Sequence, residues 1–144
     1  MLKNLIKSFF KKEPDKVSVN IERYEQLLMV RLYVNDRSRA KIQCVIESED
    51  TILIGDIQHS KENTDYNKGY GSRMMKALLD YAKEQHFSIL CGNLSVVDLD
   101  HKERLHHFYK KFGFDIIEYP ELRGNYYGKI ELCLSKLKPF EVNI

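Results

Sequence analysis

The sequence predicts a mixed α/β fold, in which one mixed sheet carries helices on its faces. Three observations support this fold class. Four successive segments in the first part of the chain alternate apolar and polar side chains, as half-buried strands do. Two later segments carry apolar side chains at helical spacing. Apolar segments between and after them indicate further strands. The expected order is a helix, four strands, a helix, a strand, a helix and two strands.

The segment Met1 to Lys12 predicts an amphipathic helix, which Pro14 ends. Its apolar residues recur at helical spacing, with lysines on the opposite face. They are Leu2, Leu5, Ile6, Phe9 and Phe10. We expect such a helix to pack on its own domain or on a partner subunit; a basic amphipathic helix can also lie on a membrane surface. The segment has neither the continuous apolar stretch nor the cleavage site of a signal peptide. We therefore divide the chain into this helix, 1–14, and one domain, 15–144.

The four alternating segments predict an antiparallel meander. The first three place their apolar residues on one face: Val17, Val19 and Ile21; then Leu28, Val30, Leu32 and Val34; then Ala40, Ile42, Cys44 and Ile46. The fourth, Thr51 to Gln58, is apolar on both faces, which is typical of a central strand. The first two are expected to join through a tight turn near Glu22 to Glu25. Later strands are expected at Phe87 to Val97, interrupted at Gly92-Asn93, at Asp115 to Tyr119 and at Lys129 to Leu134.

Two apolar stripes predict the helices of the domain. The first helix begins at Gly71, and its stripe is Met74, Met75, Leu78, Leu79 and Ala82. The stripe of the second is Leu105, Phe108, Tyr109 and Phe112. Asp100 and Glu103 have the spacing of a capping box at its start. At its end, Gly113 suits a left-handed residue and Phe114 the hydrophobic contact that follows one.

Composition indicates one ordinary globular domain. Chains of roughly 100–200 residues usually form a single domain. The net charge of +2 gives no indication of a nucleic-acid partner. Three cysteines, far apart in apolar contexts and without a CxxC pair, favour core thiols in a reducing cytoplasm over a disulfide framework. No apolar run reaches the ~20 residues that span a bilayer.

The most informative segment is Asp56 to Arg73, which runs from the central strand through a polar loop and the turn Lys68-Gly69-Tyr70-Gly71-Ser72 into the first helix of the domain. Glycines allow close backbone approach, and the amides of a first helical turn attract anions. Two better-known phosphate loops are excluded. A dinucleotide fingerprint needs a glycine where Met74 stands, and no Gly-Lys-Ser/Thr run exists for a P-loop. The turn is therefore a candidate pyrophosphate site.

A second motif strengthens this interpretation. The chain carries Tyr66-Asn67-Lys68-Gly69-Tyr70-Gly71 and later Tyr109-Lys110-Lys111-Phe112-Gly113-Phe114, with one strand between them. This pair of motifs resembles the GCN5-related N-acetyltransferase (GNAT) family over roughly residues 50–120. In that family a Gln/Arg-x-x-Gly-x-Gly/Ala loop holds the pyrophosphate of CoA, and a Tyr-x-Lys-x-Gly-Phe segment ends the next helix. Tyr109 matches the family tyrosine, and Lys111 matches the lysine to within one residue.

The resemblance implies the GNAT-like acyl-CoA N-acyltransferase fold and acetyl-CoA as co-substrate. It also implies two sets of contacts with acetyl-CoA. The strand edge from Ile57 to His59 would hydrogen-bond the pantetheine arm. Backbone amides of six residues would bind the pyrophosphate: Asn67, Lys68, Gly69, Tyr70, Gly71 and Ser72. Lys102, which stands where the family often has an asparagine, is counted with the cofactor-binding residues.

The resemblance further implies a direct transfer. The acceptor amine would attack the acetyl carbonyl in a ternary complex, and Tyr109 would protonate the leaving thiolate as general acid. An amine needs a base, and the candidates are Asp56, His59 and Asp98. We single out Asp56 as catalytic, because a carboxylate in an apolar strand needs partners. Asp98 and Asp100 are also candidates for helix capping. The histidines at 101, 106 and 107 lack HExxH spacing, so we expect no metal.

Three departures from the family pattern bear on function. Tyr66 replaces the Gln/Arg, Lys102 replaces the asparagine, and the tight turn near Glu22 to Glu25 stands where two helices usually wall the acceptor site. The leading hypothesis is a cytoplasmic, acetyl-CoA-dependent N-acetyltransferase. Its acceptor is a small-molecule, peptide or protein amine. Either the open site admits a large acceptor, or the second subunit of a homodimer completes it. The alternative is a non-catalytic GNAT-like module that binds acyl-CoA or another protein.

Overall fold

The structure is a computed structural model, and it describes residues 13–59 and 69–136 of the chain. The helix expected at 1–12 therefore lies outside the described residues, as do Asn67 and Lys68. The strands are β1 (Val17–Tyr24), β2 (Leu27–Val34), β3 (Arg37–Ile46), β4 (Thr51–His59), β5 (Ile89–Ser95), β6 (Asp115–Arg123) and β7 (Tyr126–Cys133). The helices are α2 (Tyr70–Glu84), α3 (Lys102–Lys111) and two short 3-10 turns, η2 (Val96–His101) and η3 (Leu134–Lys136).

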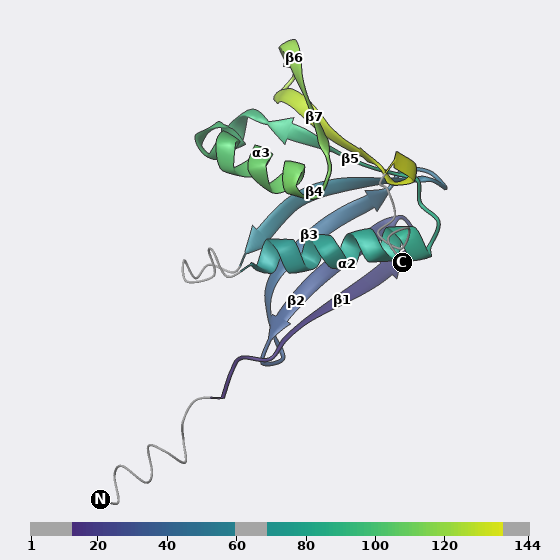
Figure 1. The fold of residues 1–144 in the computed structure, drawn as a ribbon, viewed down its shortest axis with the longest axis vertical. Helices are drawn as coiled ribbons and strands as arrows, with labels where there is room; N and C mark the ends of the chain where they lie inside the picture. Colours follow the sequence, from purple (N-terminus) through teal and green to yellow (C-terminus); the bar gives the residue numbers. More distant parts are fainter. Residues whose placement is uncertain (1–12, 60–68, 137–144) are drawn as a thin grey trace, which may run out of the picture.

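The seven strands form one mixed sheet in the order β1-β2-β3-β4-β5-β7-β6 (Figure 1). β4 and β5 pair in parallel, and every other neighbouring pair is antiparallel. β7, the last of the described strands, lies between β5 and β6. The mixed sheet, the antiparallel meander and the order of helices and strands within the domain are confirmed.

The core lies between α2 and one face of β1, β2 and β3. All five residues of the first predicted helical stripe are buried: Met74, Met75, Leu78, Leu79 and Ala82. They meet the residues of the sheet that the alternation assigned to one face, among them Val30, Leu32, Ile42 and Cys44. Burial of this shared apolar area is what orients α2 across the sheet.

β4 and β5 pair over only four residues before they separate. Thr51 to Ile54 pair with Ile89 to Gly92, after which β4 continues against β3 and β5 against β7. The register between β3 and β4 shifts between Ile42 and Cys44, opposite Gly55 and Asp56. A Cβ at Gly55 would lie 2.5 Å from the carbonyl oxygen of Gln43, so only glycine allows this close approach. The bulge turns the end of β4 away from β5 and opens a wedge in the sheet.

Two sequence-based predictions about this region are wrong. β5 is continuous through Gly92 and Asn93 and ends at Ser95, because Gly92 pairs with both Ile54 and Ile130. The chain then forms η2, capped by the Ser95 hydroxyl, which accepts a hydrogen bond from the backbone N–H of Val97 (3.3 Å).

The capping box predicted at Asp100 and Glu103 is absent. α3 begins one residue later than expected, with His101 at the N-cap position and no side-chain cap. The intervening 3-10 turns of η2 occupy the residues that the capping box assigned to the helix entry.

The end of α3 is as predicted. Gly113 has a φ of 93°, in the left-handed region that favours glycine. The N–H of Gly113 donates to the carbonyl of Lys110 (2.9 Å), and the N–H of Phe114 donates to that of Tyr109 (3.1 Å). The rings of Tyr109 and Phe114 meet edge-on, with centroids 5.5 Å apart. This Schellman motif fixes where Tyr109 lies relative to the strand that follows.

The turn between β1 and β2 consists only of Glu25 and Gln26, and Glu25 has a φ of 55°. The expected tight connection is therefore confirmed, one residue later than predicted. Among the described helices, none is long and apolar enough to cross a membrane.

Candidate active site

The wedge between β4 and β5 holds a cavity of about 320 Å³. Residues 55–58 of β4 form one wall, and residues 92–94 of β5 form the other together with Asp98 of η2. Leu105 and Tyr109 of α3 complete the lining. The cavity thus exists because two parallel strands part, and its walls carry the two residues that were singled out as catalytic, Tyr109 and Asp56.

Tyr109 is 6% exposed, and its ring packs edge-on against Phe108 and Phe114. No described residue hydrogen-bonds its hydroxyl. Burial raises the pKa of Tyr109 well above its usual value, and the charges of Asp56 and Asp98 raise it further. The hydroxyl therefore stays protonated at neutral pH, beside a cavity. This is the state that a proton donor requires.

Asp56 lies on the cavity wall but is exposed. The expectation of a buried carboxylate in an apolar strand is therefore wrong, because the bulge at Gly55 carries Asp56 out of the core-facing register. Its place on the cavity wall still agrees with a role at the site. The support for that role is the cavity, and not the burial from which the role was inferred.

Asp98 stands on η2, at the opposite wall of the cavity. Partial burial raises the pKa of its carboxyl, and the charge of Asp56 raises it further. Two carboxylates that repel one another across a cavity favour a cation or a proton between them. Asp98 does not cap α3, so the capping interpretation of this residue is not supported.

The other β4 residues that were expected to bind acetyl-CoA lie along the same strand. Ile57 lines the cavity and pairs with Ile42. His59 ends β4 opposite Ala40 and is half-buried, and it lies outside the cavity lining. β4 pairs with β5 only as far as Ile54, so its edge from Gly55 onward faces the wedge.

The N-terminus of α2 has the features of an anion site. Gly69 is its N-cap residue with a φ of 75°, and no side chain caps the helix. The first turn carries no acidic residue. Tyr70 is 5% exposed, so its side chain belongs to the core and only its backbone can face a ligand. Gly71 packs closely on α3, since a Cβ there would lie 3.3 Å from the ring of Phe108.

Lys111 brings a positive charge to this helix end. Its Nζ donates a hydrogen bond to the Ser72 hydroxyl (2.7 Å) and lies 5.1 Å from the centroid of the Phe112 ring. The end of α3 and the start of α2, 39 positions apart at this contact, are thus joined at one point. Sequence reasoning matched Lys111 to the motif but did not include it among the binding residues. The signal was its place two residues after Tyr109. We call Lys111 and the backbone amides of residues 70–72 the anion site.

Lys102 lies outside the anion site. Its Nζ pairs with the carboxylate of Glu118 on β6 at 2.5 Å and sits 5.4 Å from the centroid of the Tyr127 ring. The Tyr127 hydroxyl in turn hydrogen-bonds Nε2 of His106 (2.9 Å). Lys102 therefore joins α3 to the β6–β7 hairpin and is not part of the cavity lining. Within residues 13–59 and 69–136, no group of His, Cys, Asp and Glu side chains is arranged to hold a metal ion.

Comparison with known proteins agrees with this geometry. Residues 65–114 match the model of the acetyltransferase (GNAT) family. The segment includes both motifs on which the resemblance rests, and Phe114 is its last residue. The resemblance to the GNAT acetyltransferases is therefore confirmed.

Solved GNAT structures share the fold. An acetyltransferase from Elizabethkingia anophelis with acetyl-CoA bound superposes with a TM-score of 0.61 at 14% identity, over 83% of this chain and 99% of that one. The ribosomal-protein-S18-alanine N-acetyltransferase of Escherichia coli has a TM-score of 0.62 at 11% identity, over 87% of this chain and 97% of that one. The predicted GNAT fold is confirmed by these two.

A curated relative matches a shorter part of this chain than the two structures do. An uncharacterised protein of Bacillus subtilis (strain 168), YocC, is 37% identical over 68 residues. The match covers 47% of this chain and 38% of that protein's length, so the chain spans well under half of the curated relative it matches.

Proposed function

We propose that this chain, which has the fold of the GNAT acetyltransferases, is an acetyl-CoA-dependent N-acetyltransferase. The observation that carries the proposal is Tyr109, a buried residue on the wall of a cavity that opens between parallel strands, whose hydroxyl has a raised pKa and no hydrogen-bond partner among the described residues. The Elizabethkingia anophelis structure of the same fold has acetyl-CoA bound. Together, the fold and the proton donor favour acyl transfer from a thioester.

The proposed path of acetyl-CoA follows the cavity and the anion site. The pyrophosphate would bind the amides at the start of α2 and the ammonium of Lys111, since helix N-termini and lysines both attract phosphate. Gly69 belongs to this set, as do Asn67 and Lys68 outside the described residues. The pantetheine arm would add to the exposed edge of β4 from Ile57 to His59 like an extra strand.

Chemistry then proceeds in a ternary complex. The acceptor nitrogen attacks the acetyl carbonyl carbon, and the bond from that carbon to sulfur breaks. The thiolate takes the proton of Tyr109, and the proton released by the newly formed amide nitrogen replaces it. Holding the two substrates together supplies much of the rate, because a bimolecular step becomes effectively unimolecular. Asp56 or Asp98 would take the first proton of an amine that arrives as an ammonium ion.

The cellular setting is a further part of the proposal. A reducing cytoplasm is supported by Cys44, Cys91 and Cys133, which are all free thiols. Self-association as a homodimer and contact of residues 1–12 with a membrane surface stay predictions.

A thermal-shift experiment tests the cofactor. Acetyl-CoA or CoA at about 100 times its dissociation constant should stabilise the protein by about 2.7 kcal/mol, a rise in Tm of several degrees, whereas ATP should not. Absence of any shift with both CoA ligands would contradict the proposal.

Tyr109→Phe separates catalysis from binding alone. Removing the hydroxyl should lower the rate of transfer by about 10²–10⁴ and leave the CoA-induced Tm shift intact, because the ring contacts remain. The alternative, a non-catalytic module that binds acyl-CoA, is supported by the engagement of Lys102 with Glu118, which leaves Lys102 outside the cavity lining. That alternative predicts equal, negligible rates for wild type and Tyr109→Phe.

A further inference from the structure

We infer that the acceptor is a polypeptide, whose primary amine enters between Asp56 and Asp98 as an ammonium ion and whose apolar side chains rest on an exposed rim outside the cavity. The inference rests on the proposed acetyl transfer and names its substrate class. Two independent features carry it: the charge inside the cavity and the apolar surface beside it.

The side chains that line the cavity suit a cation that also donates hydrogen bonds. Asp56 and Asp98 belong to opposite walls, one on β4 and one on η2. Tyr109, which is 6% exposed, lines the same cavity, and no described residue hydrogen-bonds its hydroxyl. An ammonium group has three donors and no acceptor, which matches two carboxylates and a hydroxyl oxygen. A neutral acceptor would leave the two negative charges facing one another.

The surface beside Asp98 is apolar and exposed. Val97 is 78% exposed and Leu99 is 48% exposed, and they flank Asp98 on η2. Tyr126 (42%) continues this surface, since β7 pairs with Ser95 at that point and Val96 donates to the carbonyl of Asn125. Leu122 (62%) precedes Arg123, the β6 residue that pairs with Tyr126. We call Val97, Leu99, Leu122 and Tyr126 the apolar rim.

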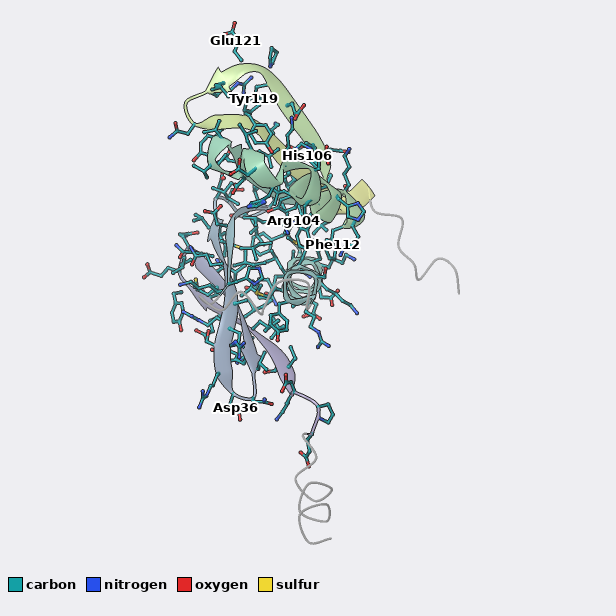
Figure 2. All side chains as sticks on the ribbon, turned by 90° about the vertical axis from the view of Figure 1, so that its left-hand side faces the viewer. Asp36, Arg104, His106, Phe112, Tyr119 and Glu121 are labelled. Atoms are coloured by element: carbon teal, nitrogen blue, oxygen red, sulfur yellow. The ribbon has the colours of Figure 1, made fainter. Side chains whose placement is uncertain are left out.

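The rim lies at the opposite end of α3 from the anion site. η2 enters the N-terminal end of α3, whereas Lys111 is its last residue, and ten helical residues span about 15 Å. The nucleotide end of acetyl-CoA at the anion site would therefore leave the rim uncovered. Figure 2 shows α3 beneath the β6–β7 hairpin, with Tyr119 and Glu121 on the hairpin, toward the end of the hairpin that lies away from the rest of the sheet. Four exposed apolar residues beside a charged cavity mouth are typical of a site for another polypeptide.

The extent of this surface argues against a small amine. A ligand that reaches both the carboxylates and the rim must leave the cavity and run over η2 and the end of β7. An extended peptide does so with a few residues, each ~3.3 Å long. The two carboxylates argue against a second copy of this chain as the natural occupant, because a subunit interface would bury them unpaired unless it supplied a cation.

The experiment uses CoA-saturated protein and defined probes. One octapeptide offers a free α-amino group followed by leucines, and a second offers a lysine between leucines with its own N-terminus acetylated. Each has two controls: the same peptide with its amine acetylated, and the same peptide with serines for leucines. Fluorescence anisotropy gives the Kd, and release of the CoA thiol from acetyl-CoA gives kcat/KM, with n-butylamine as the small-amine probe.

The expected result is a preference of about tenfold or more for a free-amine leucine peptide over both of its controls and over n-butylamine. Asp98→Asn and Asp56→Asn should weaken binding of the free-amine peptide about tenfold and leave the acetylated peptide unchanged. Val97→Ser with Leu99→Ser should abolish the preference for leucine over serine. Val45→Ser, on β3 and 42% exposed, is the matched control and should change nothing.

Three outcomes would overturn the inference. The first is n-butylamine reacting as fast as the leucine peptides. The second is a rim variant with an unchanged leucine preference. The third is a dimer that Val97→Ser with Leu99→Ser converts to a monomer, which would make the rim a subunit contact. In each case a retained Tm shift with CoA and a retained effect of Tyr109→Phe would leave the proposed acetyl transfer standing, whereas loss of both would refute the transfer itself.

Discussion

Tyr109 combines three roles that are usually given to separate residues. Its carbonyl accepts the hydrogen bond from Phe114 that ends α3, its ring packs against two phenylalanines, and its hydroxyl faces the cavity. The backbone and ring contacts hold the hydroxyl in one place, which is what a general acid needs before the substrates arrive. The sequence identified this residue through the resemblance, in which Tyr109 and the Gly-Phe that follows it match the family motif.

Substitution of Asp98 by asparagine is expected to raise the stability of the fold and to lower the rate of transfer. The folded-state pKa of Asp98 is raised, so its contribution to stability is present below its unfolded pKa and is lost as the pH rises through the folded value. At pH 7 the ionised carboxylate therefore destabilises the fold. Asp98→Asn should raise the Tm at pH 7, with the difference shrinking toward about pH 4, while transfer falls about 10²-fold or more.

Thermal melts at the two pH values and a transfer assay check the prediction for Asp98. Asp100→Asn is the matched control: Asp100 is exposed on the same 3-10 segment and outside the cavity lining, so it should leave both quantities nearly unchanged. A Tm of Asp98→Asn below the wild-type value at pH 7 would contradict the raised pKa of Asp98.

The site residues that sequence reasoning missed depend on contacts between distant segments. Lys111 meets Ser72 only because α3 packs on the start of α2, and no local pattern encodes that contact. The exposure of Asp56 has the same origin. Alternation predicted its strand correctly, but the bulge at Gly55 depends on the carbonyl of Gln43 across the sheet.

At the scale of helices and strands, the junction of α2 and α3 should govern cofactor affinity. Lys111→Gln removes the ammonium beside the amides of α2, and CoA should bind about tenfold more weakly, since charged hydrogen bonds are worth about 1.5–3 kcal/mol. Its affinity should also depend less on salt. Isothermal titration at two salt concentrations measures both effects.

Lys110→Gln is the control for that experiment. Lys110 is the exposed neighbour of Lys111 on α3, so its substitution should change the Kd by no more than about twofold. Equal effects of the two variants would mean that net charge, and not the geometry at Ser72, determines the affinity.

The end of α3 gives a prediction about stability. An L-residue at the φ of 93° of Gly113 is strained, so Gly113→Ala should cost about 1–2 kcal/mol and lower the Tm by several degrees. Gly113→Asn should lose less, because asparagine tolerates the left-handed region better. Differential scanning calorimetry of the two variants tests this. A Tm for Gly113→Ala at or above the wild-type value would contradict it.

The boundaries of elements were the least predictable part of the fold. The stripes of α2 and α3 and the alternation of β1 to β3 follow from side-chain periodicity, which is local. Where η2 stands, the sequence predicts the end of a strand and the start of a helix, because Val96 and Val97 continue the apolar run of β5. Its 3-10 form depends on the Ser95 cap and on the contact of Val96 with Asn125, which the sequence does not display.

For the whole molecule, hydrogen exchange should divide the sheet into a stable centre and a region that responds to ligand. Backbone amides of β2 and β3 should exchange most slowly, since Leu28, Val30, Leu32 and Ile42 are fully buried, whereas the edge strands β1 and β6 should exchange faster. CoA should add protection at residues 55–59 and at the start of α2. Mass spectrometry of exchange with and without CoA tests this, and protection confined to β1 or β6 would contradict it.

The position of β7 affects how the chain is completed during synthesis. β5 is one neighbour of β7 and β6 is the other, although β7 is translated after both. A nascent chain that has emerged only as far as β6 therefore presents the bare edge of β5, with its N–H and C=O groups unpaired, and β6 has no strand to pair with. A ribosome that stalls before residue 126 would leave a sheet whose β5 edge can pair with any exposed strand, and the eight residues of β7 close that edge.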